Sequence, residues 1–153
     1  MARSFCLTIP FEPHSKRSPS ATYNHKLRIP IIIDPDKERK RDISDWILEN
    51  HRLPSTPLSG SLELEMVFGI VIPESLSKKQ REARLATSWA LECKKDLDNM
   101  QKLYQDILNF GGLKGKIFGD DHQICYSKTY KIWSDKPCIF IYLRELTEPR
   151  FNL

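Results

Sequence analysis

The sequence predicts a single α+β domain, in which helices pack on one face of a mixed β-sheet. Segments with strand and helix patterns follow one another in the order strand, helix, strand, helix, strand, strand, which is typical of a sheet covered by helices. The 153 residues suffice for one compact domain, and neither a repeat nor a linker divides them. Hydrophobic residues make up 40% and charged residues 29% of the chain, which excludes a disordered or fibrous protein.

The first third of the chain is expected to begin with a strand and a loop. Residues 4–9 alternate apolar and polar side chains and end at Pro10, a pattern typical of a strand. Residues 13–30 are rich in proline, serine and basic residues and favour a long basic loop. The isoleucines at 31–33 indicate a short extended segment.

A first helix is predicted from Asp34 to about His51. Asp34 is a good capping residue, and Pro35 suits the first helical position. The helix places three apolar side chains on one face, at the spacing i, i+3, i+4: Ile43, Trp46 and Ile47.

The middle of the chain carries the clearest strand pattern. Residues 62–66 alternate, and the apolar run continues to Ile72 before a proline. Residues 74–93 are polar and basic, and we expect them to form a surface excursion with a short helix over 77–86. Its charged interior argues against a place in the core.

A second helix is predicted over residues 98–109, where a glycine pair stops it. Two closing strands are expected over 123–131 and 137–143, joined by a turn at 134–136. Residues 151–153 carry no pattern.

Charge alone indicates an anionic partner only weakly. The formal net charge is +4 and the isoelectric point is about 8.9. Basic clusters are distributed along the chain, and each taken alone is explained as well by a solvated helix face or loop. They lie at 37–41, 78–79 and 94–95.

The cysteines and the absence of long apolar runs favour a soluble protein in a reducing cytoplasm. The cysteines have neither C-x-x-C spacing nor a neighbouring histidine at zinc-finger spacing, so they are interpreted as small hydrophobic residues. No signal peptide opens the sequence, and no apolar run approaches the roughly 20 residues of a membrane helix. The four cysteines are Cys6, Cys93, Cys125 and Cys138.

The strongest candidates for catalytic or metal-binding residues lie around the start of the second helix. Asp96 and Asp98 are separated by one residue, and they can point to the same side if Asp96 is still extended and Asp98 is the N-cap. Lys102 follows Asp98 by one helical turn, and Asp120 with Asp121 opens the next strand. Gathered carboxylates repel one another unless a cation binds them, and Mg²⁺ is the hard cation that suits a few carboxylates and phosphate oxygens.

A purely structural explanation of these residues stays open. Asp98 can be only a helix cap, Asp120 and Asp121 only a turn, and Lys102 only the surface partner of Asp106. An EF-hand calcium loop fits less well, because Met100 and Gln101 stand where that loop needs an oxygen ligand and a glycine. No G-x-S-x-G, H-E-x-x-H or P-loop pattern occurs in the chain.

Three blocks of this region resemble the RusA family of Holliday-junction resolvases. The blocks are Asp-Leu-Asp-Asn-Met-Gln-Lys at 96–102, Asp106 with Leu-Asn at 108–109, and Asp-Asp-His-Gln-Ile at 120–124. The resemblance is good over residues 94–143 and looser before them. It implies a RusA-like fold over a single domain, 1–153.

The resemblance implies a Mg²⁺-dependent endodeoxyribonuclease, with Mn²⁺ as an acceptable substitute. Its metal ligands and catalytic aspartates would be Asp96, Asp98 and Asp121, and Lys102 would be the essential lysine. Asp120, Asn99 and Gln123 match further motif positions, and His122 is a candidate to support the metal ligands from outside.

The resemblance also implies a homodimer that nicks symmetrically related strands of a four-way DNA junction, in recombination and repair. Its expected location is the cytoplasm of a bacterium or of a phage-infected cell. A two-fold symmetric protein suits that substrate. The loop at 110–119 is longer and richer in glycine and lysine than the family connection. Expected phosphate contacts are Lys16, Arg17, Lys78, Lys79, Lys94, Lys95, Lys114 and Lys116. The alternatives are a noncatalytic DNA-binding or phage accessory protein of the same fold, and a less selective branched-DNA nuclease.

Overall fold

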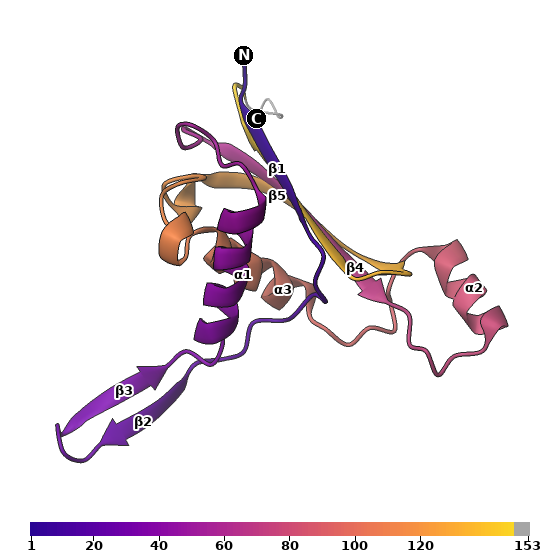
Figure 1. Ribbon diagram of the computed structural model, residues 1–153, viewed down its shortest axis with the longest axis horizontal. Coiled ribbons are helices and arrows are strands. Elements are labelled where there is room, and N and C mark those ends of the chain that lie inside the picture. Colours follow the sequence, from indigo (N-terminus) through magenta and orange to yellow (C-terminus); the bar gives the residue numbers. More distant parts are fainter. Residues whose placement is uncertain (149–153) are drawn as a thin grey trace.

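A four-stranded mixed sheet forms the centre of the computed structural model, which describes residues 1–148 (Figure 1). Its strand order is β1-β6-β4-β5, with β4 and β5 parallel and the other neighbours antiparallel. The unpatterned residues 151–153 lie outside the described part. The strands are β1 (Ser4–Ile9), β4 (Leu62–Val71), β5 (Ile124–Ser134) and β6 (Cys138–Glu145).

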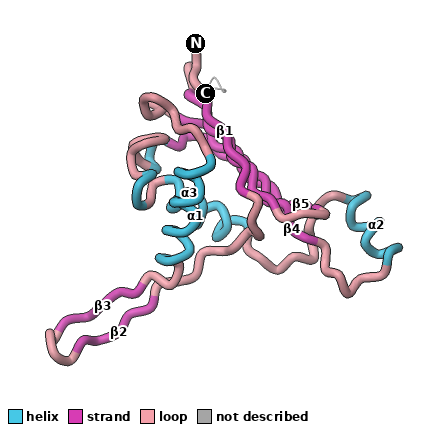
Figure 2. The backbone as a smooth tube through the Cα atoms, in the orientation of Figure 1, coloured by secondary structure: helices cyan, strands magenta, loops and turns pink. Residues whose placement is uncertain are grey.

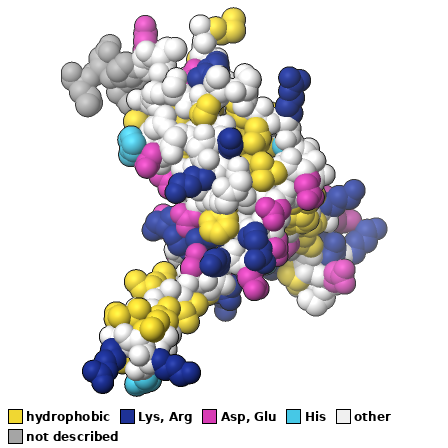
Figure 3. Space-filling model, turned by 60° about the vertical axis from the view of Figure 1, so that its left-hand side comes forward, with side chains coloured by type: hydrophobic (Ala, Val, Ile, Leu, Met, Phe, Trp, Pro, Cys, Tyr) yellow, Lys and Arg dark blue, Asp and Glu magenta, His cyan; other side chains and the backbone are white. Residues whose placement is uncertain are grey.

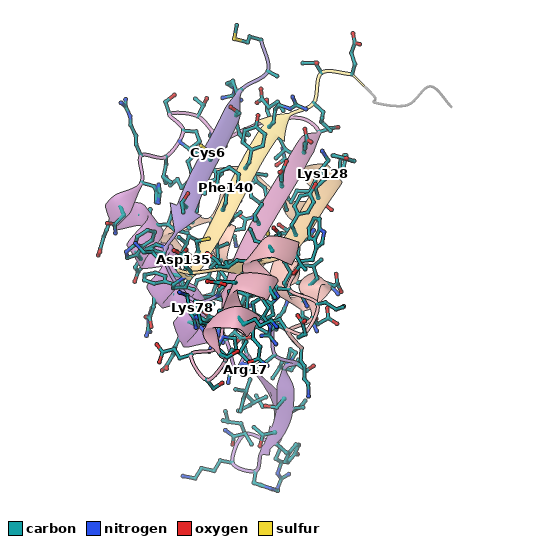
Figure 4. The ribbon with its side chains drawn as sticks, turned by 90° about the vertical axis from the view of Figure 1, so that its right-hand side faces the viewer. Cys6, Arg17, Lys78, Lys128, Asp135 and Phe140 are labelled. Carbon is teal, nitrogen blue, oxygen red and sulfur yellow. The ribbon has the colours of Figure 1, made fainter. Side chains whose placement is uncertain are left out.

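Two helices, α1 (Lys37–Asn50) and α3 (Leu97–Leu108), cover one face of this sheet and close the core (Figure 1). The inward residues of the strands alternate with outward ones, as in β1, where every second side chain is buried. Cys6, Phe140 and Lys128 lie on the other face, away from these two helices (Figure 4). The predicted α+β class with helices on one face is confirmed.

The excursion predicted at 74–93 carries an exposed helix, but its last part reaches the core, because Ala90 is 1% exposed and packs there. Helix α2 (Lys78–Thr87) projects beyond the end of the sheet and buries none of its residues (Figure 1). Ser77 caps it by accepting a hydrogen bond from the Gln80 backbone N–H, and the Gln80 side chain accepts one from Ser77 in return. This reciprocal capping box stabilises a helix that receives little from packing.

The long basic loop expected at 13–30 was wrong in its second half. Residues 20–33 form an antiparallel hairpin of β2 (Ser20–Asn24) and β3 (Ile29–Ile33), which extends away from the body (Figure 2). The segment 31–33 is extended, as predicted, but it belongs to this hairpin. Exposed apolar residues stand on both faces of the hairpin, so the alternation that marks a half-buried strand is missing.

The first helix starts at Lys37, later than predicted, because Asp34 closes a turn before the helix instead of capping it. Its carboxylate accepts a hydrogen bond from the Asp36 backbone N–H at 2.9 Å and closes a turn before the helix. Asp36 then stands at the N-cap, but its side chain makes no capping bond, since it is buried and binds Arg17 and Arg39 instead.

The closing strands β5 and β6 follow each other in the chain but lie on opposite sides of β4. Their short connection therefore crosses the end of β4, where Gly69 pairs with Cys138 and Ile132. A Cβ atom on Gly69 would lie 2.4 Å from the Cys138 Sγ atom and 3.2 Å from the Ser134 Cβ atom. Glycine at this position makes room for the crossing.

Candidate active site

Helix α3 presents acidic and basic side chains on its exposed face. Asp98, Lys102 and Asp106 are four residues apart, so they form one stripe along the helix. The Lys102 Nζ atom lies 2.6 Å from Asp98 Oδ2, and this contact raises the pKa of Lys102. The opposite face anchors the helix in the core through Met100, Leu103, Tyr104, Ile107 and Leu108.

Asp96, rather than Asp98, is the N-cap of α3. Its backbone is extended, and its carboxylate accepts a hydrogen bond from the Asn99 backbone N–H at 3.1 Å. Its own carbonyl accepts the first helical bond, from the Met100 N–H. Asp98 consequently falls in the first turn, where the positive end of the helix dipole favours a carboxylate.

The surroundings of Asp121 disfavour a negative charge on its carboxylate. Burial and the nearby carboxylates of Asp106 and Asp120 raise its pKa, while Lys16 opposes that shift. A carboxylate that is partly desolvated among like charges is one that a bound cation would relieve.

The residues next to Asp121 hold the turn in which it lies. The Asp120 carboxylate accepts a hydrogen bond from the backbone N–H of His122 at 3.0 Å. The Nδ1 atom of the His122 ring lies 2.8 Å from the same Asp120 oxygen. These hydrogen bonds lower the pKa of Asp120. The Gln123 side-chain oxygen accepts from the N–H groups of Gly119 and Asp120. In this structure Asp120, His122 and Gln123 therefore act on the backbone of the turn.

The long loop before this turn is anchored in the core. Leu113, Ile117 and Phe118 are fully buried, and the chain pairs with Leu58 at Phe118. Its added length does not leave the loop loose, because these anchors fix where the chain enters Asp120 and Asp121.

A buried lysine joins this region to the first helix, and no pattern in the sequence predicts it. Lys40 is 6% exposed, and its Nζ atom lies 2.8 Å from Asp34 Oδ2 and 3.1 Å from Asp106 Oδ2. Lys16, predicted to contact DNA, binds the same Asp106 oxygen at 2.6 Å. Asp106 thus pairs with these two lysines and not with Lys102.

The structure brings some of the predicted residues together and leaves others apart. Asp98 and Lys102 are in contact, and Asp96 is next to them at the cap. Asp121 interacts with Asp106, which lies eight residues, or roughly 12 Å, farther along the helix than Asp98. Within residues 1–148, no three His, Cys, Asp or Glu side chains are grouped closely enough to hold a metal ion. The metal role of Asp96, Asp98 and Asp121 stays a prediction.

The remaining basic residues predicted to contact DNA fall into two groups. Arg17 and Lys95 are engaged within the protein, by Asp36 and by Glu12 respectively. The others are exposed: Lys78, Lys79, Lys94, Lys114 and Lys116.

Comparison with known protein families places this chain in one class, the endodeoxyribonucleases. The family described as "Endodeoxyribonuclease RusA" matches residues 10–144. The chain belongs to the RusA endodeoxyribonuclease family. It is also 27% identical over 103 residues to the uncharacterized protein YqaN of Bacillus subtilis (strain 168), covering 66% of this chain and 68% of that protein. Within the described residues, no helix is long and apolar enough to span a membrane.

Proposed function

We propose that this protein is a Mg²⁺-dependent endonuclease that resolves Holliday junctions by paired symmetric nicks, acting as a homodimer. The observation that carries the proposal is the arrangement on α3, where the exposed Asp98–Lys102 pair follows directly on Asp96 at the helix N-terminus. Family membership supports DNA cleavage, and the oxygen-rich acidic residues support the choice of metal.

Two properties of the carboxylates support a magnesium ion. The pKa of Asp121 is raised, first by partial desolvation and then by the Asp106 carboxylate, and this supports a bound cation beside it. Asp98 is 69% exposed in its side chain, so it is accessible to an ion that keeps part of its water shell. Asp96, Asp98 and Asp121 would hold the ion, which when bound would act as a Lewis acid on the scissile phosphodiester.

The protein's own residues would contribute position and charge. Asp96 keeps its backbone extended and fixes the start of α3, so the carboxylate of Asp98 is oriented by a rigid, core-anchored helix. Lys102 holds a positive charge one turn along from Asp98, where it can compensate the charge that develops on the phosphate oxygens or the leaving oxygen.

One observation favours a second candidate, a DNA-binding protein of this fold without cleavage. Asp121 neighbours Asp106 rather than the N-terminus of α3, and the described residues hold no ready group of three metal-ligating side chains. A binding protein would show salt-sensitive association with DNA and no metal-dependent nicking.

The test compares a labelled synthetic four-way junction with a matched linear duplex, in Mg²⁺ and in EDTA. The informative variant is Asp96→Asn, because asparagine caps a helix as well as aspartate does and only the charge is lost. Asp45→Asn, an exposed aspartate on α1, is the matched control.

Paired nicks that require Mg²⁺, survive in Asp45→Asn and vanish in Asp96→Asn would support the resolvase. Tight binding of the junction without any cut would support the binding protein instead. Equal cutting of junction and duplex would indicate a general nuclease.

A further inference from the structure

The hairpin of residues 20–33, hereafter the arm, exposes more apolar surface than an isolated hairpin normally tolerates. None of its residues is buried, and it extends from the body as a separate two-stranded sheet (Figure 2). Large exposed apolar surfaces mark contact sites for partners. The side chains concerned and their exposed fractions are Tyr23 50%, Leu27 65%, Ile29 48%, Ile32 77% and Ile33 47%.

The arm and the segment leading to it also carry the whole net charge of the protein. Residues 13–33 contain Lys16, Arg17, Lys26 and Arg28 and no Asp or Glu, so they contribute +4, equal to the +4 of the full chain. Lys16 and Arg17 are paired at the base, whereas no ion pair within residues 1–148 includes Lys26 or Arg28. Two positive charges without an ion-pair partner in the described residues therefore lie at the end of the arm, where Figure 3 shows basic side chains.

The tip is held in shape by its own contacts. The Asn24 side-chain oxygen accepts hydrogen bonds from the backbone N–H groups of Lys26 and Leu27, both at 3.0 Å. Arg28 completes the turn with a φ of 53°, in the left-handed region. Leu27 is thus held at the tip with a cation on each side of it in sequence.

This combination fits DNA better than a protein. A two-stranded ribbon is narrow enough to enter the major groove, and an apolar wedge flanked by basic residues is the device by which proteins part stacked bases. The penalty for parting bases is smallest where stacking or pairing is already disturbed, as at a DNA branch point.

We propose that the arm binds DNA at or beside the branch point, with Lys26 and Arg28 on phosphates and Leu27 against the faces of parted bases. The proposal rests on the proposed function for its substrate, a branched DNA. It does not depend on cleavage, and it is tested in EDTA, where no metal-dependent nicking occurs.

The first measurement is the salt dependence of junction binding, for wild type and for the double variant Lys26→Gln/Arg28→Gln. Each phosphate contact contributes about 0.9 to the slope of log K against log salt, so the double variant should lower the slope by about 1.8. Arg52→Gln/Lys136→Gln removes two exposed charges from outside the arm and should leave the slope unchanged. An unchanged slope in the Lys26/Arg28 variant would overturn the proposal.

The second measurement follows the bases themselves. A junction with 2-aminopurine beside the branch point should brighten when saturated with wild-type protein, because parted bases no longer quench the probe. Leu27→Ala should lose this increase, while Leu91→Ala, which truncates an 85% exposed leucine outside the arm, should retain it. Equal brightening with Leu27→Ala would refute the wedge.

A protein partner is the competing use of the arm, and it has a distinct result. The wild type could sediment as a dimer and the arm variants as monomers, while the salt dependence of DNA binding is the same for both. In that case the arm binds a second copy of the chain, and the proposal fails. The proposed cleavage can fail independently. If the wild type does not nick DNA in Mg²⁺ but both effects of the arm variants are observed, the cleavage proposal is refuted and the arm proposal is supported.

Discussion

Replacing Lys40 by methionine should destabilise the protein by about 2 kcal/mol. The substitution keeps an apolar side chain of similar length and removes the ammonium group that binds Asp34 at 2.8 Å and Asp106 at 3.1 Å. Both carboxylates would then face each other's charge, with only Lys16 left on Asp106.

The magnitude follows from the exposure of the three groups. Removing one partner from a fully buried ion pair costs about 3–5 kcal/mol, because the other charge is left without compensation. Here the lysine side chain is 8% exposed, but the carboxylates of Asp34 and Asp106 are 36% and 28% exposed and can recover part of their hydration. About half of the full penalty is therefore expected, and in a chain of this length roughly 2 kcal/mol lowers the melting temperature by about 4–8 °C.

The assay is urea unfolding followed by circular dichroism, with Lys37→Met as the control on an exposed lysine of the same helix. Burial opposes the charge of Lys40, but the bonds to Asp34 and Asp106 outweigh it and raise the pKa of Lys40. Above the acid range in which Asp34 is protonated, the contribution of Lys40 should therefore be constant up to about pH 10.4, and it should be lost as the pH rises through the folded pKa. If Lys40→Met lowers the free energy of unfolding no more than Lys37→Met does, the reasoning is refuted.

Three further predictions concern single contacts. Gly69→Ala should destabilise by about 1–3 kcal/mol through its clash with Cys138, and urea unfolding should show partial rescue by Cys138→Ala. Asp121→Asn should raise stability in EDTA, because the raised pKa of Asp121 means that folding disfavours its charge; it should also abolish stabilisation by Mg²⁺ in thermal unfolding, and a destabilised variant would contradict this. Arg3 and the Ser59 N–H lower the pKa of Glu145 to about 2, so the stability that this carboxylate contributes should be lost below pH 4, and carbon-detected NMR should show it titrating near pH 2.

The elements that were predicted well are those whose burial follows a simple period. Helix α3 begins one residue before the predicted bound, and its buried face has the expected spacing. Strand β4 matches the predicted run at 62–72 to within one residue. In both elements, the buried residues recur at the period of the helix or strand, so the sequence alone predicts the element.

The missed features have no such pattern. The arm buries none of its residues, so no buried face marks its strands, and the segment Ile29–Ile33 resembles an apolar loop as much as a strand. The pairing of Lys40 with Asp106 joins residues 66 positions apart, and no sequence period links them. The exchange of the N-cap from Asp98 to Asp96 depends on one backbone angle, which either aspartate could have adopted.

The anchored loop at 110–119 also offers a place to modify the protein. Its buried side chains bracket Gly115, whose φ is 69° and around which a Cβ atom would meet nothing within 4 Å. Lys114 and Lys116 on either side are exposed. Because Leu113 before them and Ile117 after them are fixed in the core, extra residues inserted here would loop outward without displacing the aspartates that follow. A fluorescent reporter inserted at this point would thus lie a few residues before Asp120 and Asp121 and leave the backbone of that turn unchanged.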